Sequence, residues 1–277
     1  MSARSISMPH LVPIAAGDDV ARGPGIFADF LERNYKGYRV VENLYFHARR
    51  PYHEYRTSAD LLSALDGLYK KASTLRTGPI FFGGEHSATF HIVSFLLRKL
   101  DSVCLIIFDA HSDCQGDEGA IHNWNFLRQL KATFGTRITL VHLGFRDLDQ
   151  VALERICDEL ISVNVIASRG VAFAEQRIKA ICGERHTHIS IDVDVFDPLL
   201  FHSVKSPISG GLLPREVISL LRALVGCNVL SGDIVEFAPG QPLLMEMLLL
   251  ADLFYELERI CANSGHVYCS DGNPFPA

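Results

Sequence analysis

Positive charge is scarce in this sequence. Its 26 lysine and arginine residues are outnumbered by 32 aspartate and glutamate residues, which gives a net charge of -6 and a pI near 6.0. No run of basic residues occurs, whereas proteins that bind nucleic acids present basic patches to the phosphates. The composition therefore argues against a nucleic-acid partner.

Long apolar runs and paired cysteine motifs are also missing. The most hydrophobic window, residues 243–255, is interrupted by Glu246 and Asp252 and is too short to span a bilayer. No long apolar segment follows the first five residues, so we expect no signal peptide and predict a cytoplasmic location. The seven cysteines are scattered without a C-x-x-C pair, which disfavours a zinc knuckle or a disulfide framework.

Short apolar segments alternate with amphipathic segments along most of the chain. This pattern predicts an α/β fold of three αβα layers, with a mainly parallel central sheet and helices on both faces. No repeat or linker is present, so we expect one domain over residues 1–277. The predicted strands are 5–16, 38–46, 80–82, 103–108, 137–143, 161–165, 187–193 and 228–235. The predicted helices are 26–34, 58–75 with Ser58 as its cap, 88–100, 125–134, 150–160, 172–182, one from Pro214, and 242–262.

Polar side chains gather where one predicted strand ends. Asp109, His111 and Asp113 follow an apolar run and are spaced by two, so an extended backbone would place them on one face. Two carboxylates beside an imidazole are costly unless positive charge lies between them. This spacing indicates a metal site; taken alone, it also fits a solvated loop.

Two further segments repeat this arrangement. Asp192 and Asp194 share a face at the end of another apolar run, and His86 follows a third. Sites in open α/β sheets form where strands end at their carboxyl side, so these groups are expected to meet. Two imidazoles and four carboxylates are too many for one closed site and suit a pair of hard divalent ions.

These residues carry a family resemblance. The segments GGEHS (83–87), DAHSD (109–113) and SIDVDVFDP (190–198) resemble the three signature motifs of the ureohydrolase family, which contains arginase and agmatinase. The similarity extends from about Gly83 to Glu236, and the order of the motifs fits. The resemblance implies an arginase-like fold and two Mn²⁺ ions per subunit, bridged by hydroxide. One ion would be held by His86, Asp109, Asp113 and Asp192, and the other by His111, Asp109, Asp192 and Asp194.

The resemblance also implies roles in turnover. Asp113 would hydrogen-bond the nucleophile, Glu236 would bind the substrate guanidinium, and His122 would pass a proton to the leaving amine. Glu236 as a solvated strand-end carboxylate and His122 as a loop histidine are the alternatives, because the family usually has His-Gly where this chain has His122-Asn123. The histidines without matching motifs are interpreted as structural: His142, His186, His188 and His202.

The segments that would contact the rest of the substrate depart from the family pattern. Asp149 matches an arginase aspartate that helps to recognise the α-amino group, although a helix N-cap is an equal alternative. Gln115 replaces the asparagine that contacts the α-carboxylate, and the acidic pair Asp117 and Glu118 follows it. Ser206 is a further candidate contact; it lies in SVKSP (203–207), which replaces the family's G-T-G-T-P and introduces a lysine.

The sequence thus predicts a binuclear manganese amidinohydrolase that converts arginine or an arginine-like substrate into urea and an amine such as ornithine. Because Asp117 and Glu118 would repel a free carboxylate, arginine within a peptide is included among the substrates. Agmatine, a guanidino acid and hydroxyarginine are the close alternatives. The more distant ones are a two-metal phosphoesterase, a zinc deacetylase-like enzyme and a metal-binding protein without turnover. The family resemblance also makes a homo-oligomer possible, since relatives commonly form trimers or hexamers, but the sequence does not give the oligomeric state.

Overall fold

The computed structural model describes residues 10–15, 20–34, 55–74, 77–116 and 119–264. Within them lies a seven-stranded sheet of order β1-β2-β7-β6-β3-β4-β5, in which all neighbouring strands are parallel. The strands are β1 (His10–Pro13), β2 (Pro79–Phe82), β3 (Val103–Phe108), β4 (Ile138–Leu143), β5 (Glu159–Ile161), β6 (Thr187–Asp192) and β7 (Val229–Val235). The predicted α/β architecture with a parallel sheet is confirmed.

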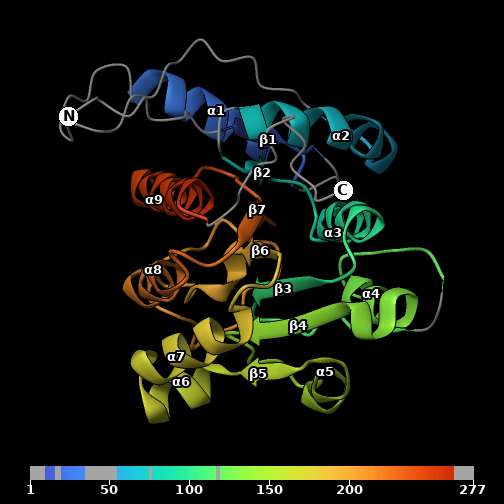
Figure 1. Ribbon diagram of the computed structural model, residues 1–277. Helices are drawn as coiled ribbons and strands as arrows, with labels where there is room; N and C mark the ends of the chain where they lie inside the picture. Colours follow the sequence, from blue (N-terminus) through green and yellow to red (C-terminus); the bar gives the residue numbers. More distant parts are fainter. Residues whose placement is uncertain (1–9, 16–19, 35–54, 75–76, 117–118, 265–277) are drawn as a thin grey trace, which may run out of the picture.

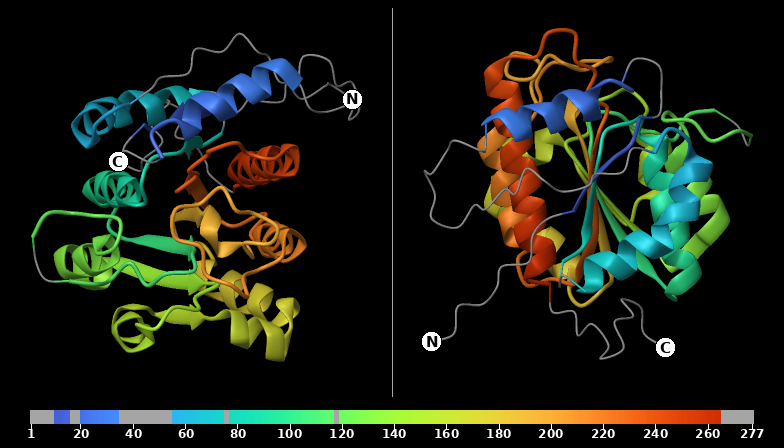
Figure 2. Two further views of the ribbon diagram at one scale, coloured as in Figure 1. Left: turned by 180° about the vertical axis from the view of Figure 1, so that it is seen from behind. Right: turned by 90° about the horizontal axis from the view of Figure 1, so that it is seen from above.

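Helices cover both faces of this sheet (Figures 1 and 2). One layer contains α1 (Gly23–Asn34), α6 (Val163–Arg169), α7 (Val171–Cys182), α8 (Pro214–Ala223) and α9 (Leu244–Ala262). The other contains α2 (Ser58–Thr74), α3 (Ser87–Lys99), α4 (Phe126–Phe134) and α5 (Gln150–Ile156). Each layer buries its own apolar cluster against the sheet. In the described part of the chain, no helix is both long and apolar enough to cross a membrane.

The central strands are buried along their whole length because both of their faces are covered, and β3 is apolar throughout. All six residues of β3 are buried, as are all seven of β7. Alternation with polar residues is typical of a sheet with one solvated face, so its absence in β3 follows from the three layers. A fully buried aliphatic side chain contributes about 1.5–3 kcal/mol, so each apolar residue of β3 stabilises the fold.

The structure corrects several predicted boundaries. The predicted strand 161–165 ends at Ile161, and the residues after it form helix α6: Ser162 accepts a hydrogen bond from the Val165 amide, and Gly170 ends the helix at φ 85°. Helix α5 ends at Ile156, and β5 begins at Glu159. Thr57 rather than Ser58 caps α2, because its hydroxyl accepts from the Asp60 amide. The predicted strand at 38–46 lies outside the described residues.

A buried carboxylate ties α9 to the loop after β6. Glu246 is fully buried, and its side chain accepts hydrogen bonds from the amides of Leu243, His202 and Ser203 and from the Ser203 hydroxyl. We expect Glu246→Ala to lower the free energy of unfolding by about 3 kcal/mol, because buried donors lose their acceptor. Urea denaturation measures this loss. The exposed control Glu184→Ala should change stability by less than about 0.5 kcal/mol, and an equal effect of both would contradict the assignment.

Candidate metal centre

The predicted ligands lie at the carboxyl ends of adjacent strands. His86 follows β2, Asp109 to Asp113 follow β3, and Asp192 and Asp194 lie at the end of β6. These strands and β7, which leads to Glu236, are neighbours in the order β2-β7-β6-β3. The parallel sheet therefore brings residues from distant segments to one edge.

Two glycines turn the chain from β2 towards the site. Gly83 and Gly84 have φ values of +84° and +80°, a region that favours glycine. A Cβ atom at Gly83 would lie 2.2 Å from Pro24 Cγ, so a larger residue would displace the packed chain. This turn places His86 at the start of α3 with its ring inside the site.

His86 is surrounded by three carboxylates. Its Nδ1 atom lies 3.1 Å from Asp109 Oδ2, 3.0 Å from Asp113 Oδ2 and 3.3 Å from Asp192 Oδ2. His86 is fully buried, as is Asp109, and the other two carboxylates are nearly so. One imidazole nitrogen and three oxygens thus converge on one small volume.

A second group shares Asp109 with the first. His111 Nδ1 lies 2.8 Å from Asp194 Oδ2 and 3.6 Å from Asp109 Oδ1. The two oxygens of Asp109 therefore face different histidines, the arrangement expected of a carboxylate between two ions. The structure brings all six predicted ligands together in two groups of suitable spacing.

The local backbone differs from the extended one that the spacing suggested. β3 ends at Phe108, so Asp109, His111 and Asp113 lie on a loop and not on a pleated strand. Asp194 lies in a 3-10 turn, Val193–Val195, in which the Asp192 side chain accepts a hydrogen bond from the Asp194 amide. The groups converge because the loops turn inwards. The prediction that an extended backbone places Asp109, His111 and Asp113 on one face was therefore wrong.

Unpartnered buried atoms indicate that a cation fits this cluster. His86 Nδ1 and Asp109 Oδ2 have no hydrogen-bond partner among the described residues, although they lie close together. Buried polar atoms rarely go unpaired, and a shared cation would satisfy both. Carboxylate oxygens and imidazole nitrogens suit manganese and similar divalent ions, and no thiolate takes part in either group of described residues.

The pKa values of the predicted ligands also indicate that the cluster needs a positive charge. Burial and the charge of Asp109 raise the pKa of Asp113 to about 8. Burial and the charges of Asp194 and Asp109 raise the pKa of Asp192 well above its ordinary value. Burial lowers the pKa of His111, but the carboxylates of Asp109 and Asp194 outweigh it and raise this pKa to about 12. Without a metal, the cluster therefore holds protons.

Metal affinity is consequently expected to rise with pH. Below the raised pKa values of Asp113 and Asp192, a cation must displace the protons that these carboxylates retain. Each displaced proton makes affinity rise by about tenfold per pH unit, so Mn²⁺ should bind at least tenfold more tightly at about pH 7.5 than at about pH 6.5. Calorimetric titration in two buffers of different ionisation enthalpy measures affinity and proton release together. Constant affinity without proton release would contradict this prediction.

Two predicted site residues hold strained backbone conformations. Asp113 has a φ of 45° and Glu236 a φ of 60°, and they are the only residues other than glycine with positive φ in the described chain. Such conformations cost free energy and persist where the surroundings impose them, most often at functional sites. Both strained residues thus fall among those that the motifs selected.

Glu236 faces the cluster from the end of β7. Its Oε1 atom accepts hydrogen bonds from the His86 amide at 2.8 Å and from Asn123 Nδ2 at 3.4 Å. Burial raises its pKa, so the ionised form gains from a cationic partner. The alternative of a solvated strand-end carboxylate does not fit, because only 7% of Glu236 is exposed.

His122 lies on a loop that packs over the site. The Asn125 side chain organises this loop: it accepts from the His122 amide at 2.9 Å and donates to the Ala120 carbonyl at 3.0 Å. The ring of Phe126, the next residue, lies 4.6 Å from that of His86. Through these contacts the loop is held beside the ligands, with His122 partly exposed.

A buried polar network behind His86 was not predicted. His86 Nε2 contacts Ser190 Oγ at 2.9 Å, and Ser190 Oγ donates to Asp233 Oδ1 at 2.5 Å. Asp233 Oδ2 also accepts from the Thr89 hydroxyl and lies 2.8 Å from His188 Nε2. This network orients the ring so that Nδ1 faces the carboxylates. His188 is structural, as predicted, but it serves the site.

A sequence signal for this network does exist. His188 and Ser190 alternate with apolar residues along β6, Ser231 and Asp233 do so along β7, and the register pairs them across the two strands. Polar residues at alternate positions of a strand buried on both faces need partners, so this alternation marks the network.

Arg146 fixes the geometry between two site loops. Its guanidinium donates to the carbonyls of Asp194, Val195, Phe196 and Ile208, which joins the end of β4 to the segment after β6. Burial lowers its pKa. The arginine thus acts as a clamp on the backbone that carries Asp194.

The predicted substrate contacts are less fixed by their surroundings. Asp149 occupies the N-cap position of α5, but its side chain makes no capping hydrogen bond, which leaves the carboxylate available. Gln115 and Ser206 are exposed, and neither is drawn into the metal cluster. Asp117 and Glu118 lie outside the described residues. These assignments stay predictions.

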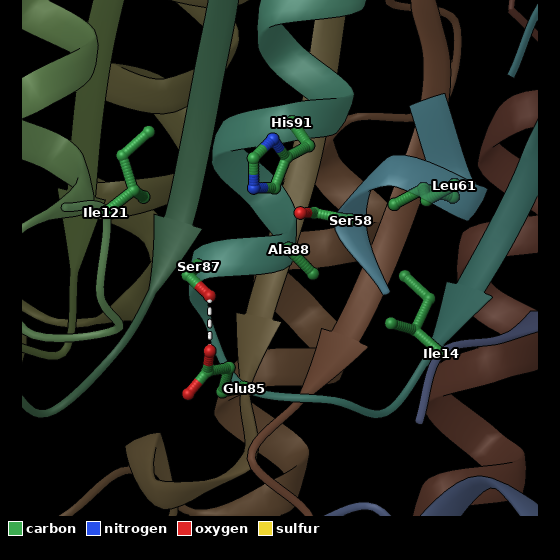
Figure 3. Close-up of a pocket in the computed structure, with 8 residues that line it drawn as sticks. All are labelled: Ile14, Ser58, Leu61, Glu85, Ser87, Ala88, His91 and Ile121. Atoms are coloured by element: carbon green, nitrogen blue, oxygen red, sulfur yellow. Dashed lines mark hydrogen bonds between the residues drawn. The ribbon is translucent and has the colours of Figure 1, made fainter. Parts of the chain in front are cut away.

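A small pocket lies beside the metal cluster but does not contain it. Figure 3 shows Glu85 and Ser87, joined by a 2.9 Å hydrogen bond, with His91 further along α3. Its remaining lining residues are Ile14, Ser58, Leu61, Ala88 and Ile121. Glu85 and Ser87 flank His86 in sequence, so this pocket and the cluster share the start of α3.

Comparisons with known proteins agree with this picture. The profile described as "Arginase family" matches residues 33–257. A guanidinopropionase of Pseudomonas aeruginosa is 29% identical over 189 residues, which cover 65% of this chain and 59% of that protein. A mitochondrial arginase of Medicago truncatula is 32% identical over 167 residues, which cover 58% of this chain and 48% of the relative. The matched segments thus span about half the length of these relatives.

Solved structures share the fold at lower identity. The proclavaminate amidino hydrolase from Streptomyces clavuligerus has a TM-score of 0.72 and 20% identity, with 93% of each chain covered. The formimidoylglutamase from Bacillus subtilis has a TM-score of 0.73 and 18% identity, with 96% of this chain and 90% of that chain covered. At such identities the likeness concerns the α/β architecture alone.

Proposed function

The chain belongs to the arginase family, and we propose that it is a metal-dependent amidinohydrolase that cleaves a guanidino group into urea and an amine. The observation that carries this proposal is the pair of ligand groups that share Asp109, together with the unpartnered His86 Nδ1 and Asp109 Oδ2 atoms that a divalent ion would satisfy. We further propose that these ions are Mn²⁺. His86, Asp109, Asp113 and Asp192 would hold one, and His111, Asp109, Asp192 and Asp194 the other.

When bound, such ions lower the pKa of water towards ~7 and supply a nucleophile at neutral pH. The protein supplies position and charge. Asp113 is held in a strained conformation beside His86 and would accept a hydrogen bond from the attacking water. Glu236, nearly buried and in need of a cationic partner, is suited to bind the planar guanidinium. His122 would donate a proton to the leaving amine.

The departures around the predicted substrate pocket support a substrate without a free α-carboxylate. Gln115 stands where arginases have a carboxylate-binding asparagine, and the acidic pair Asp117 and Glu118 follows it. The uncapped carboxylate of Asp149 suits an amino or amide nitrogen. We therefore propose arginine within a peptide as the substrate. Agmatine, which has no carboxylate, is the second candidate on the same observation.

A phosphoesterase is disfavoured by the charge of the site. A transferred phosphoryl group needs a cationic clamp, but the guanidinium of Arg146 is committed to backbone carbonyls. The cluster itself presents four aspartates and a nearby glutamate, which favour a cationic substrate group.

A urea-release screen with Mn²⁺-loaded protein tests the proposal. Its substrates are free arginine, arginine blocked at both ends, agmatine and guanidinopropionate. We expect blocked arginine to give the highest kcat/KM, with agmatine above free arginine and guanidinopropionate. Faster turnover of free arginine would overturn the substrate assignment alone. No urea from any of the four, with two ions bound per chain, would overturn the proposed function.

A further inference from the structure

Trp124 is the only tryptophan in the chain, and half of its side chain is exposed. Its indole ring lies on the imidazole of His122, with ring centroids 4.3 Å apart and an angle of 9° between the planes. The arginase-family pattern has His-Gly at this point, whereas this chain has His-Asn-Trp. The stacked indole ring therefore comes from a segment in which this chain departs from the family pattern. The Trp124 side chain thus packs against His122 outside the apolar core.

The backbone under this pair is fixed on both sides. The Asn125 side chain accepts from the His122 amide, and the Asn125 amide donates to the His122 carbonyl at 3.2 Å. The Trp124 carbonyl accepts from the Gln115 amide at 2.8 Å, two residues beyond the predicted ligand Asp113. The backbone of Trp124 is therefore held in place by a hydrogen bond to the loop that carries the predicted ligands.

A proton donor must keep its ring within hydrogen-bond reach of the leaving atom. His122 is partly exposed, and a histidine ring in that setting has freedom at both side-chain torsions unless it is packed. A nearly parallel neighbour removes much of this freedom, because the ring cannot rotate without losing the stacking contact.

We propose that Trp124 is a positioning residue that holds the His122 imidazole in its working orientation by stacking. This inference rests on the proposed function for its kinetic part only. The stacking itself is a property of the folded protein and is measurable without turnover.

Fluorescence of the sole tryptophan tests the contact directly. An imidazole in contact with an indole quenches its emission, so His122→Asn should raise the emission of Trp124. His202→Asn, which removes a histidine outside this contact, should leave the emission unchanged. If the unmodified protein and His122→Asn give the same emission, the rings are not stacked in solution and the proposal fails.

Kinetics test the consequence. Misplacing a catalytic group by about 1 Å can cost on the order of 10²-fold, so we expect Trp124→Ala to lower kcat by about 10- to 100-fold with little change in KM. Trp124→Phe keeps an aromatic face and should recover most of kcat. Phe173→Ala, which removes an aromatic ring of α7 that lies against the guanidinium of Arg169 at the end of α6, is the matched control and should leave kcat unchanged.

A double variant separates positioning from general support of the fold. If Trp124 acts through His122, Trp124→Ala should have no further effect on kcat in a His122→Asn background. A full additional loss there would overturn the positioning role. A quenched tryptophan in a protein that releases no urea from any guanidino compound would overturn the proposed function and leave the stacking intact.

Discussion

Asp192→Asn is expected to abolish turnover while making the metal-free protein more stable. Asparagine keeps the shape of the side chain and can still accept from the Asp194 amide through its oxygen. It removes the charge that both proposed ions share, so kcat should fall by at least about 10³-fold and Mn²⁺ binding should weaken. Urea assays and equilibrium dialysis measure these two losses.

The gain in stability follows from the raised pKa of Asp192. Burial and the charges of Asp194 and Asp109 hold this pKa well above the unfolded value, so the folded protein binds the proton more tightly than the unfolded chain. Stability of the metal-free protein is therefore lost as pH rises from the unfolded pKa through the folded one. The Asp192→Asn side chain carries no such charge, so the metal-free Tm of this variant should exceed that of the unmodified protein by about 2 °C or more at about pH 8.

An exposed aspartate provides the control for Asp192→Asn. Asp101 lies on the turn before β3, and Asp101→Asn should change neither kcat nor the metal-free Tm. A variant at Asp192 that lost activity and also lost stability at high pH would show that this carboxylate supports the fold, and the metal assignment would lose its main argument. A loss of activity together with a gain in the stability of the metal-free protein is typical of a site whose carboxylates need a bound cation.

The fold could be predicted from the sequence wherever burial dictated residue type. Strand β3 has the bounds that its apolar run predicted, because all six of its residues are buried and none of them is polar. Helix α6 could not be identified in this way. Its valines and isoleucine favour a strand by propensity, and the cap at Ser162 and the stop at Gly170 outweigh them.

The candidate site was predictable in composition but not in local geometry. The ligand types and their place after apolar runs were sufficient to select His86, Asp109 and Asp194. Their convergence depends on loop conformations, above all the positive φ of Asp113, that spacing does not encode. The stacking of Trp124 on His122 depends likewise on the loop that Asn125 organises.

His122→Asn is expected to lower kcat by about 10²- to 10⁴-fold, the usual contribution of a positioned proton donor. An amine leaves poorly without a proton, and asparagine does not titrate in the accessible range. Metal binding should be unaffected, because His122 belongs to neither ligand group. Rapid-quench urea assays and metal analysis of the same sample separate the two effects. The control His186→Asn changes a histidine beside the opposite end of β6, and its kcat should equal that of the unmodified protein.

Chemical rescue decides between proton transfer and packing as the role of His122. In His122→Ala the ring is replaced by space that a free imidazole can enter, and added imidazole should restore part of kcat in proportion to its concentration. If the His122 ring served only to pack the loop, its role would be structural. Trp124→Ala, which disturbs the same packing, would then lower kcat as the loss of the ring does, and added imidazole would not restore it. Full kcat in His122→Asn would remove this residue from the mechanism, and the proton for the leaving amine would have to come from solvent or from Glu236, whose pKa burial raises.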